Sequence, residues 1–376
     1  MEHYLDNAAT TMVCPEAAEA ALQAMTLCYG NPSSTHAKGR EAKKLLDRAR
    51  GQVAAALDCA PGELVFTSCG SESDNWALLG GAEAMRRRGK HVISSAVEHD
   101  AVRKSLDELE ARGFEVTRLR PNALGGIDPS AVAETLREDT ILVSLMLVNN
   151  ETGAVTDISA VSRLLKEAGS PALLHTDTVQ GFMKLPFRAK TLGADLISVS
   201  GHKIHAPKGI GALYIRSGLR LKPLLVGGAQ ENGRRAGTEA MPQIAAFGAA
   251  CEAARAGFAE NTARMAALRE SCIETLHREI PELLVLGGGA PHILSVSMPG
   301  WRSEVLINWL EAQEIYVSRS SACKKGARSH VLEAIGLRPA VIDGAIRIGF
   351  SRFSTQEDVE ALCRGLKEAR ERLSHR

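Results

Sequence analysis

The sequence predicts an α/β protein with a largely parallel sheet that helices cover on both faces. Short apolar runs recur along the chain with helical patterns between them, and polar residues follow several of these runs directly. Strands separated by helices form βαβ units, and ligands then bind at the carboxyl ends of the strands. At 376 residues, the chain is long enough for one large domain and a smaller one.

The elements of the large domain follow one another in alternating order. A helix is expected at residues 40–57, where apolar residues recur at helical spacing with Arg and Lys between them. The next expected elements are a strand at 64–67, a helix at 73–88, a strand at 91–94, a helix at 101–112, strands at 115–119 and 140–148, a helix at 159–168, and strands at 173–175 and 196–198. This order predicts the parallel sheet.

The rest of the chain predicts a second, smaller body. The glycine-rich polar run at 227–238 predicts an ordered loop, and a long helix is expected at 241–279. The remaining expected elements are a strand at 293–297, a helix at 303–313, a loop around Cys323, a strand at 345–350 and a terminal helix. We therefore expect a large domain at 12–255 and a small domain at 256–376, with residues 1–11 packing alongside the small domain.

Composition and charge exclude several classes of protein. A formal net charge of +1 gives no field that would recruit nucleic acid or a membrane surface. The apolar run at 141–148 is too short to span a bilayer, and the acidic start of the chain does not resemble a signal peptide. The 8 cysteines form no C-x-x-C pair, so we expect no metal site. These features predict a cytoplasmic protein.

Two strand ends carry the chemistry that points to a cofactor. Lys203 follows one expected strand, directly after small and hydrogen-bonding residues at 200–202 that could surround a phosphate. An amine becomes nucleophilic when burial or nearby cations lower its pKa. Asp177 follows another expected strand, where an acid could keep a pyridinium nitrogen protonated. Either residue alone would be read as a solvated loop residue or a helix cap, but together they indicate pyridoxal 5'-phosphate.

Short motifs extend this reading along nearly the whole chain. They are LDNAATT at 5–11, GNPSS at 30–34, VEH at 97–99, VNNE at 148–151, HTD at 175–177, SGHK at 200–203, RAGTE at 235–239, SAC at 321–323 and IR at 346–347. In this order the chain resembles the cysteine desulfurases of the NifS and IscS type, which are fold-type-I pyridoxal phosphate enzymes of the class V aminotransferase family. The resemblance implies a large domain with a mainly parallel seven-stranded sheet and a smaller α/β C-terminal domain.

The same resemblance implies a reaction and a role for each site residue. L-cysteine is converted to L-alanine, and the sulfur passes to an active-site cysteine as a persulfide. Lys203 binds the cofactor and moves the Cα proton, and His99 stacks on the cofactor ring. Asp177 pairs with the ring nitrogen and Gln180 with the phenolic oxygen. The further cofactor contacts that the resemblance implies are Gly70, Ser71, Asn150, Ser200, His202 and Thr238.

Two of the implied roles concern the substrate and the subunit arrangement. Arg347 binds the substrate carboxylate, because its planar fork of donors matches two oxygens, and Asn150 assists nearby. Thr238 reaches the phosphate of the neighbouring subunit's cofactor, which implies a homodimer with shared sites.

Cys323 is the expected sulfur carrier. Its neighbours are small, polar or basic, which predicts an exposed loop and favours the nucleophilic thiolate. The acceptor is expected to be an iron–sulfur scaffold or a tRNA-thiolating enzyme.

Three alternatives remain open at this point. A selenocysteine lyase, or another pyridoxal phosphate β-lyase, would use the same residues. A Cys–His hydrolase would use Cys323 and His330, but it leaves Lys203 and Asp177 without a role. A non-catalytic sulfur-pathway binding protein would not need both Lys203 and Cys323.

Overall fold

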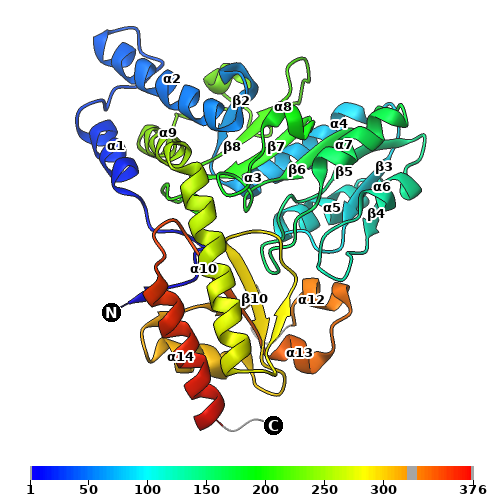
Figure 1. Ribbon diagram of the computed structural model, residues 1–376. Coiled ribbons are helices and arrows are strands. Elements are labelled where there is room, and N and C mark those ends of the chain that lie inside the picture. Colours follow the sequence, from blue (N-terminus) through cyan, green and yellow to red (C-terminus); the bar gives the residue numbers. More distant parts are fainter. Residues whose placement is uncertain (1, 320–327, 374–376) are drawn as a thin grey trace.

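The computed structural model describes residues 2–319 and 328–373, which build a large sheet and a small sheet with helices around each (Figure 1). The large sheet has seven strands in the order β2-β8-β7-β6-β5-β3-β4. Their bounds are β2 (Leu64–Thr67), β3 (His91–Ser95), β4 (Glu115–Leu119), β5 (Thr140–Ser144), β6 (Leu173–Asp177), β7 (Leu196–Ser200) and β8 (Gly211–Ile215). The mainly parallel seven-stranded sheet is confirmed.

Strand direction changes only at one side of this sheet. Strands β7, β6, β5, β3 and β4 are parallel, whereas β8 runs antiparallel to both β7 and β2. Strand β8 was not predicted from the sequence, because the chain returns to the sheet from β7 without an intervening α-helix. Strand β5 is also shorter than the expected 140–148, since residues 145–148 leave the sheet towards the site.

Helices cover both faces of the large sheet because its strand residues alternate between two apolar cores. In β5, Leu142 packs into one core with Trp76 and Leu106, and Val143 packs into the other with Val161. The helices of the large body are α1 (Pro15–Thr26), α2 (Ala37–Leu57), α3 (Gly70–Asn75), α4 (Gly81–Met85), α5 (Asp100–Ala111), α6 (Pro129–Thr135), α7 (Ile158–Glu167), α8 (Ala189–Leu192) and α9 (Met241–Ala256). A single π-helical turn (Trp76–Gly80) joins α3 to α4.

The prediction of one long helix at 241–279 is wrong, because two helices occupy this range. Helix α9 ends at Ala256, and α10 (Phe258–Glu279) begins two residues later. The intervening Gly257 leaves helical geometry with φ −106° and ψ 18°, which changes the direction of the chain. The break lies beside the expected domain boundary after residue 255, which stays a prediction.

The small sheet contains four strands in the order β12-β13-β10-β9. They are β9 (Leu284–Leu286), β10 (Ile293–Ser297), β12 (Ser318–Arg319) and β13 (Ala345–Gly349), and each adjacent pair is antiparallel. The surrounding helices are α10, α11 (Ser303–Glu311), α12 (His330–Ile335), α13 (Pro339–Asp343) and α14 (Gln356–Arg372). Near the amino terminus, β1 (His3–Tyr4) pairs in parallel with β11 (Ile315–Tyr316), which ties the first residues to this body.

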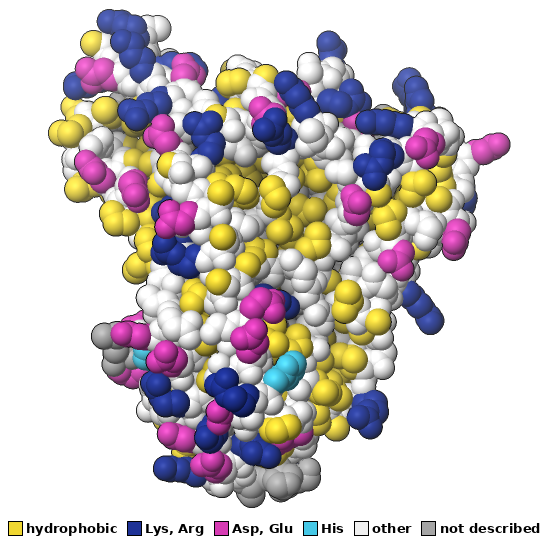
Figure 2. Space-filling model, viewed as in Figure 1, with side chains coloured by type: hydrophobic (Ala, Val, Ile, Leu, Met, Phe, Trp, Pro, Cys, Tyr) yellow, Lys and Arg dark blue, Asp and Glu magenta, His cyan; other side chains and the backbone are white. Residues whose placement is uncertain are grey.

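Hydrophobic side chains also reach the surface. Figure 2 shows them gathered over α1 and the residues that follow it. Leu22 and Met25 on α1 are each 56% exposed, and Leu27 and Tyr29 are more exposed still. Among the described residues, no helix combines the length and the apolar character that a bilayer span requires.

Candidate active site

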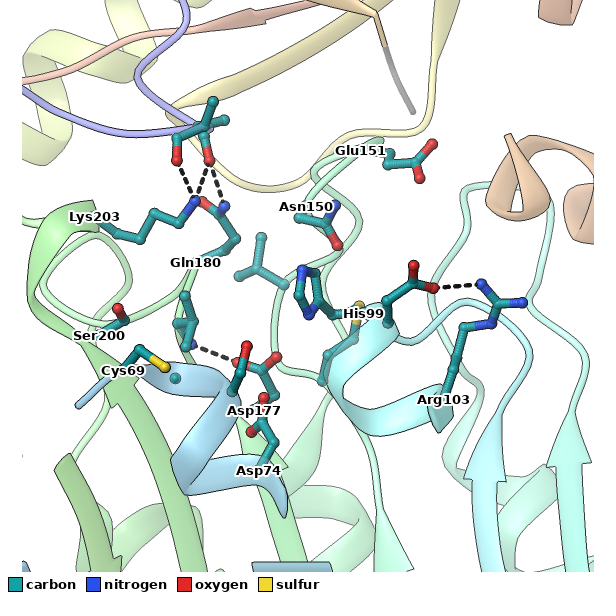
Figure 3. Close-up of a pocket in the computed structure, with 18 of the residues that line it drawn as sticks. Cys69, Asp74, His99, Arg103, Asn150, Glu151, Asp177, Gln180, Ser200 and Lys203 are labelled. Carbon is teal, nitrogen blue, oxygen red and sulfur yellow. Dashed lines mark hydrogen bonds and ion pairs between the residues drawn. The ribbon is translucent and has the colours of Figure 1, made fainter. Parts of the chain in front are cut away.

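A cavity of about 480 Å³ opens at the carboxyl ends of β6 and β7, where the small sheet faces the large one (Figure 3). Its lining includes every site residue expected from the sequence except Thr238 and Cys323. Thr238 is exposed on the loop before α9 and does not line this cavity. Cys323 lies outside the described residues. The sequence motifs therefore converge on one place, although they are spread along the chain.

Lys203 lies one 3₁₀ turn (Gly201–Lys203) beyond the end of β7. Its Nζ donates hydrogen bonds to the backbone carbonyls of Ala8 at 2.8 Å and Ala9 at 2.6 Å. Burial and the Arg347 guanidinium lower the pKa of Lys203 to about 8, although Asp6 and Asp177 oppose this shift. A sizeable fraction of the amine is therefore unprotonated near neutral pH, as a nucleophile or base requires.

Three side chains from adjacent elements form what we call the floor of the cavity: Asp74 on α3, Asp177 at the end of β6 and Ser200 at the end of β7. Figure 3 shows Asp74 directly below Asp177. The Asp177 carboxylate accepts a hydrogen bond from the Val179 N–H at 2.8 Å. Burial raises the pKa of Asp177, whereas His99 and Lys203 lower it.

The start of α3 also lines the cavity, at Gly70 and Ser71. A Cβ on Gly70 would lie 2.8 Å from the Val179 side chain, so only glycine fits at this position of the turn. The Ser200 hydroxyl is buried and has no hydrogen-bond partner among the described residues. Free N–H groups at a helix start attract phosphate. Beside them, burial and Lys203 lower the pKa of His202 to about 4, so this imidazole is neutral at pH 7.

His99 and Gln180 are held by backbone contacts. His99 caps α5, and its Nδ1 accepts a hydrogen bond from the Ala101 N–H at 3.1 Å, which fixes the ring beside the cavity. The Gln180 side-chain amide donates to the Ala8 carbonyl at 2.8 Å, and its oxygen lies 3.3 Å from the His292 ring. Both side chains are thus oriented before any ligand arrives.

Asn150 and Arg347 line the opposite side of the cavity. Together with Asp6, which Arg347 binds, they form what we call the substrate wall. The Arg347 side chain comes from β13 and is 4% exposed. Its guanidinium donates to the Asn150 carbonyl at 2.8 Å, to the Ser318 hydroxyl at 2.9 Å and to the Asp6 carboxylate at 3.1 Å. The contact with Asp6 shows that this guanidinium pairs with a carboxylate.

Several residues of the site carried no role in the sequence analysis, although motifs contain most of them. Glu98 is buried next to His99, and burial raises its pKa to about 8. Burial raises the pKa of Glu151 to about 7, and this side chain accepts a hydrogen bond from the Ser329 hydroxyl. Asp74 and the carbonyls of Ala8 and Ala9 were also missed. A backbone acceptor such as the Ala8 carbonyl leaves no signal in the sequence. Glu98 and Glu151 could have been found, because both lie within the motifs that indicated the site.

These residues fit pyridoxal phosphate. The unpartnered Ser200 hydroxyl and the crowded Gly70 turn suit a phosphate, and the buried carboxyl of Asp177 suits a ring nitrogen. The amine of Lys203 lies between them and the substrate wall, with a pKa low enough to react with an aldehyde.

Comparison with known proteins agrees with this geometry. The profile of the family "Aminotransferase class-V", a family that implies pyridoxal phosphate, matches residues 3–362. The chain is 41% identical to a cysteine desulfurase IscS from Methanosarcina thermophila, over 98% of this chain and 92% of that protein. Its structure resembles that of a NifS-like protein with a TM-score of 0.94 and 35% identity, covering 99% and 100% of the two chains.

A third match is a structure of SspA in complex with cysteine, with a TM-score of 0.80 and 31% identity over 94% of this chain and 100% of that one. Near full-length coverage at these identities leaves no large part of the chain unaccounted for. The protein belongs to the cysteine desulfurases of the aminotransferase class-V family.

Proposed function

We propose that this enzyme binds pyridoxal phosphate at Lys203, removes sulfur from L-cysteine to leave L-alanine, and passes the sulfur to Cys323 as a persulfide. The observation that carries the proposal is the arrangement of Lys203 between the floor and the substrate wall. The SspA structure contains cysteine, which supports an amino-acid substrate of this kind here.

Bound pyridoxal phosphate supplies an electron sink for the pair released at Cα. In our proposal the floor would hold it, with Asp177 facing the ring nitrogen, Gln180 near the phenolic oxygen, and Ser200 and the Gly70 turn around the phosphate. Asn150, Ser71 and His202 line the same space. His99 would lie against the ring face, and its cap contact would keep it there.

The substrate side depends on Arg347 and Lys203. Arg347 receives the carboxylate of cysteine, with the Asn150 carbonyl keeping the guanidinium in place. The unprotonated Lys203 amine takes the Cα proton, and burial makes that form accessible near pH 8.

Sulfur transfer requires a nucleophile at the substrate sulfur, and we assign this role to Cys323. Its thiolate forms an S–S bond with the substrate sulfur while the S–Cβ bond breaks. The electron pair stays on the Cβ carbon, and a proton completes the methyl group of alanine. Arg328, five residues after Cys323 in the sequence, binds Asp343 through two hydrogen bonds of 2.7 and 2.9 Å.

We also propose a homodimer in which Thr238 contacts the partner's cofactor phosphate. Two features support this arrangement. The exposed hydrophobic side chains on and after α1 would be buried by a second subunit (Figure 2). The loop that contains Thr238 is exposed in this chain, yet Arg235 fixes it through two hydrogen bonds of 2.9 and 3.1 Å to Glu72 on α3.

The expected acceptor of the sulfur is an iron–sulfur scaffold or a tRNA-thiolating enzyme, and the expected location is the cytoplasm. Every cysteine that the structure describes is free, which suits a reducing compartment.

The test is to supply the purified enzyme with pyridoxal phosphate, L-cysteine and a thiol reductant, and to measure alanine and sulfide. We expect equal amounts of both, with turnover. A parallel assay with L-selenocysteine separates the alternative, because a dedicated lyase would release alanine from selenocysteine only. Pyruvate and ammonia in place of alanine would contradict the proposal.

A further inference from the structure

A cluster of three carboxyl groups lies buried at and behind the floor. Asp74 and Glu98 are each 1% exposed, and Asp177 is 7% exposed. Each of the other two raises the pKa of Asp74 by its charge, so all three lie within electrostatic reach of one another. Three buried carboxylates would repel each other and lose their hydration at large cost. The cluster must therefore retain protons.

A chain of hydrogen bonds lies beside Asp74. Ser144 lies 2.8 Å from Nδ1 of His175, whose Nε2 lies 3.0 Å from the Ser198 hydroxyl. Ser198 also acts on Asp74 and lowers its pKa. Burial lowers the pKa of His175 to about 3, so the imidazole is neutral and has a single N–H.

Ser198 has one hydroxyl proton. When Ser198 accepts from the Nε2–H of His175, this proton can point to Asp74, and Nδ1 of His175 is then the acceptor for the Ser144 hydroxyl. The lowering effect of Ser198 on the pKa of Asp74 agrees with Ser198 as the donor.

One oxygen of Asp74 has no such donor. Its Oδ1 has no hydrogen-bond partner among the described residues, and it lies 3.6 Å from Nε2 of His175, which is too far for a hydrogen bond. The acidic groups that act on it are Asp177, Glu98 and Cys69, and burial together with these groups raises the pKa of Asp74. A buried carboxyl oxygen without a donor is more stable when it carries a proton than when it is charged.

Asp177 has the opposite surroundings. The Val179 N–H donates to it, and His99 and Lys203 both favour its charged form. We propose that Asp74 is a positioning residue, a neutral carboxylic acid beside Asp177 whose lack of charge keeps Asp177 as the ionised member of the cluster. The role deepens the proposed function, since Asp177 is the expected partner of the ring nitrogen.

The test compares the full-length, cofactor-loaded wild type with Asp74→Asn and Asp74→Leu. Asparagine keeps the shape of the Asp74 side chain and a hydrogen-bond donor, but it has no titratable proton. Leucine keeps only the side-chain volume. The first readout is the infrared C=O stretch of protonated carboxyl groups at neutral pH. We expect one such band to disappear in Asp74→Asn, and Glu98→Gln serves as the matched control that removes a different band.

The second readout is the rate at which the cofactor dissociates. We expect Asp74→Leu to release it about tenfold faster and Asp74→Asn to restore the wild-type rate. An infrared spectrum unchanged by Asp74→Asn would show an ionised Asp74 and overturn the proposal, as would equal cofactor loss in both variants. If Asp74→Leu does not fold, the infrared comparison of wild type with Asp74→Asn decides alone. That comparison does not depend on turnover, so it stays valid if the proposed reaction fails.

Discussion

The floor and the substrate wall of the cavity are built in different ways. The floor comes from α3 and from the ends of two adjacent strands of one sheet, where Asp177 pairs directly with Ser198 in the register of β6 and β7. The substrate wall joins three segments distant in the sequence, and side-chain hydrogen bonds from Arg347 hold Asp6 and Asn150 together. In the proposed function, cofactor binding is therefore fixed by the large sheet, whereas substrate binding depends on how the small sheet lies against it.

Removing the residue that serves both sides has the largest expected effect. Lys203→Ala loses the amine that we expect to bind the cofactor and to move the substrate proton, so turnover of cysteine should fall by at least about 10³-fold. Alanine release under saturating cofactor measures this loss. Lys208→Ala is the control, because Lys208 is exposed five positions further along. A similar loss in both variants would contradict the role of Lys203.

Changing the wall alone should leave the floor intact. Arg347→Lys keeps the charge but loses the planar fork, and we expect kcat/KM for cysteine to fall about 100-fold, roughly 2.7 kcal/mol, with cofactor affinity retained. Arg319→Lys is the matched control, since Arg319 on the adjacent strand binds Glu304 at 3.0 Å and does not line the cavity. Loss of cofactor from Arg347→Lys would show that the two sides are not separable.

Changing the floor alone should weaken cofactor binding and leave substrate binding nearly unchanged. Ser200→Ala removes a buried hydroxyl that we expect to bind phosphate, so the Kd for pyridoxal phosphate should rise about tenfold, while KM for cysteine changes little at saturating cofactor. The control is Ser94→Ala, a buried serine in the same sheet that donates to the Ser144 carbonyl at 2.7 Å. It should lower Tm without changing the Kd, and an unchanged Kd in Ser200→Ala would remove Ser200 from the phosphate site.

The smallest expected effect is on the pKa of Lys203, which the charge of Arg347 in the substrate wall helps to lower. The protonated amine of Lys203 cannot attack an aldehyde, so the rate of cofactor capture should rise with pH and level off above about 8, the lowered pKa of Lys203. Because Arg347 contributes to that lowering, Arg347→Met should move the midpoint to higher pH, and Arg347→Lys should leave it nearly unchanged. Stopped-flow absorbance over pH 6–10 measures both. A midpoint near 10.4, as for an exposed lysine, would contradict the burial argument.

The difference between the floor and the substrate wall also explains which site residues could be predicted from the sequence. Strand ends in a parallel sheet meet at one edge, so the pattern of apolar runs was enough to bring Asp177 and Lys203 together. Arg347 has no local signal, because an arginine on a strand is ordinarily a surface residue, and only the resemblance to a known family assigned it.

Other features depend on tertiary contacts that no local pattern encodes. Asp74 is the fifth residue of α3, and an acid on such a short helix would be interpreted from the sequence as a surface residue. Its role becomes visible only when α3 is packed over β6 and β7. Strand β8 and the break at Gly257 were missed for a related reason. Their local sequences are compatible with more than one backbone conformation, and the packing of distant elements selects one of them.

The most direct test of this division of labour is Cys323→Ala, assayed beside wild type with L-cysteine. The floor should still bind pyridoxal phosphate with the same visible absorbance, while alanine and sulfide production is lost because no thiolate attacks the substrate sulfur. Mass spectrometry of wild type after cysteine should find one additional sulfur atom on the peptide that contains Cys323. Full cysteine turnover by Cys323→Ala, or the additional sulfur on another cysteine, would contradict the account.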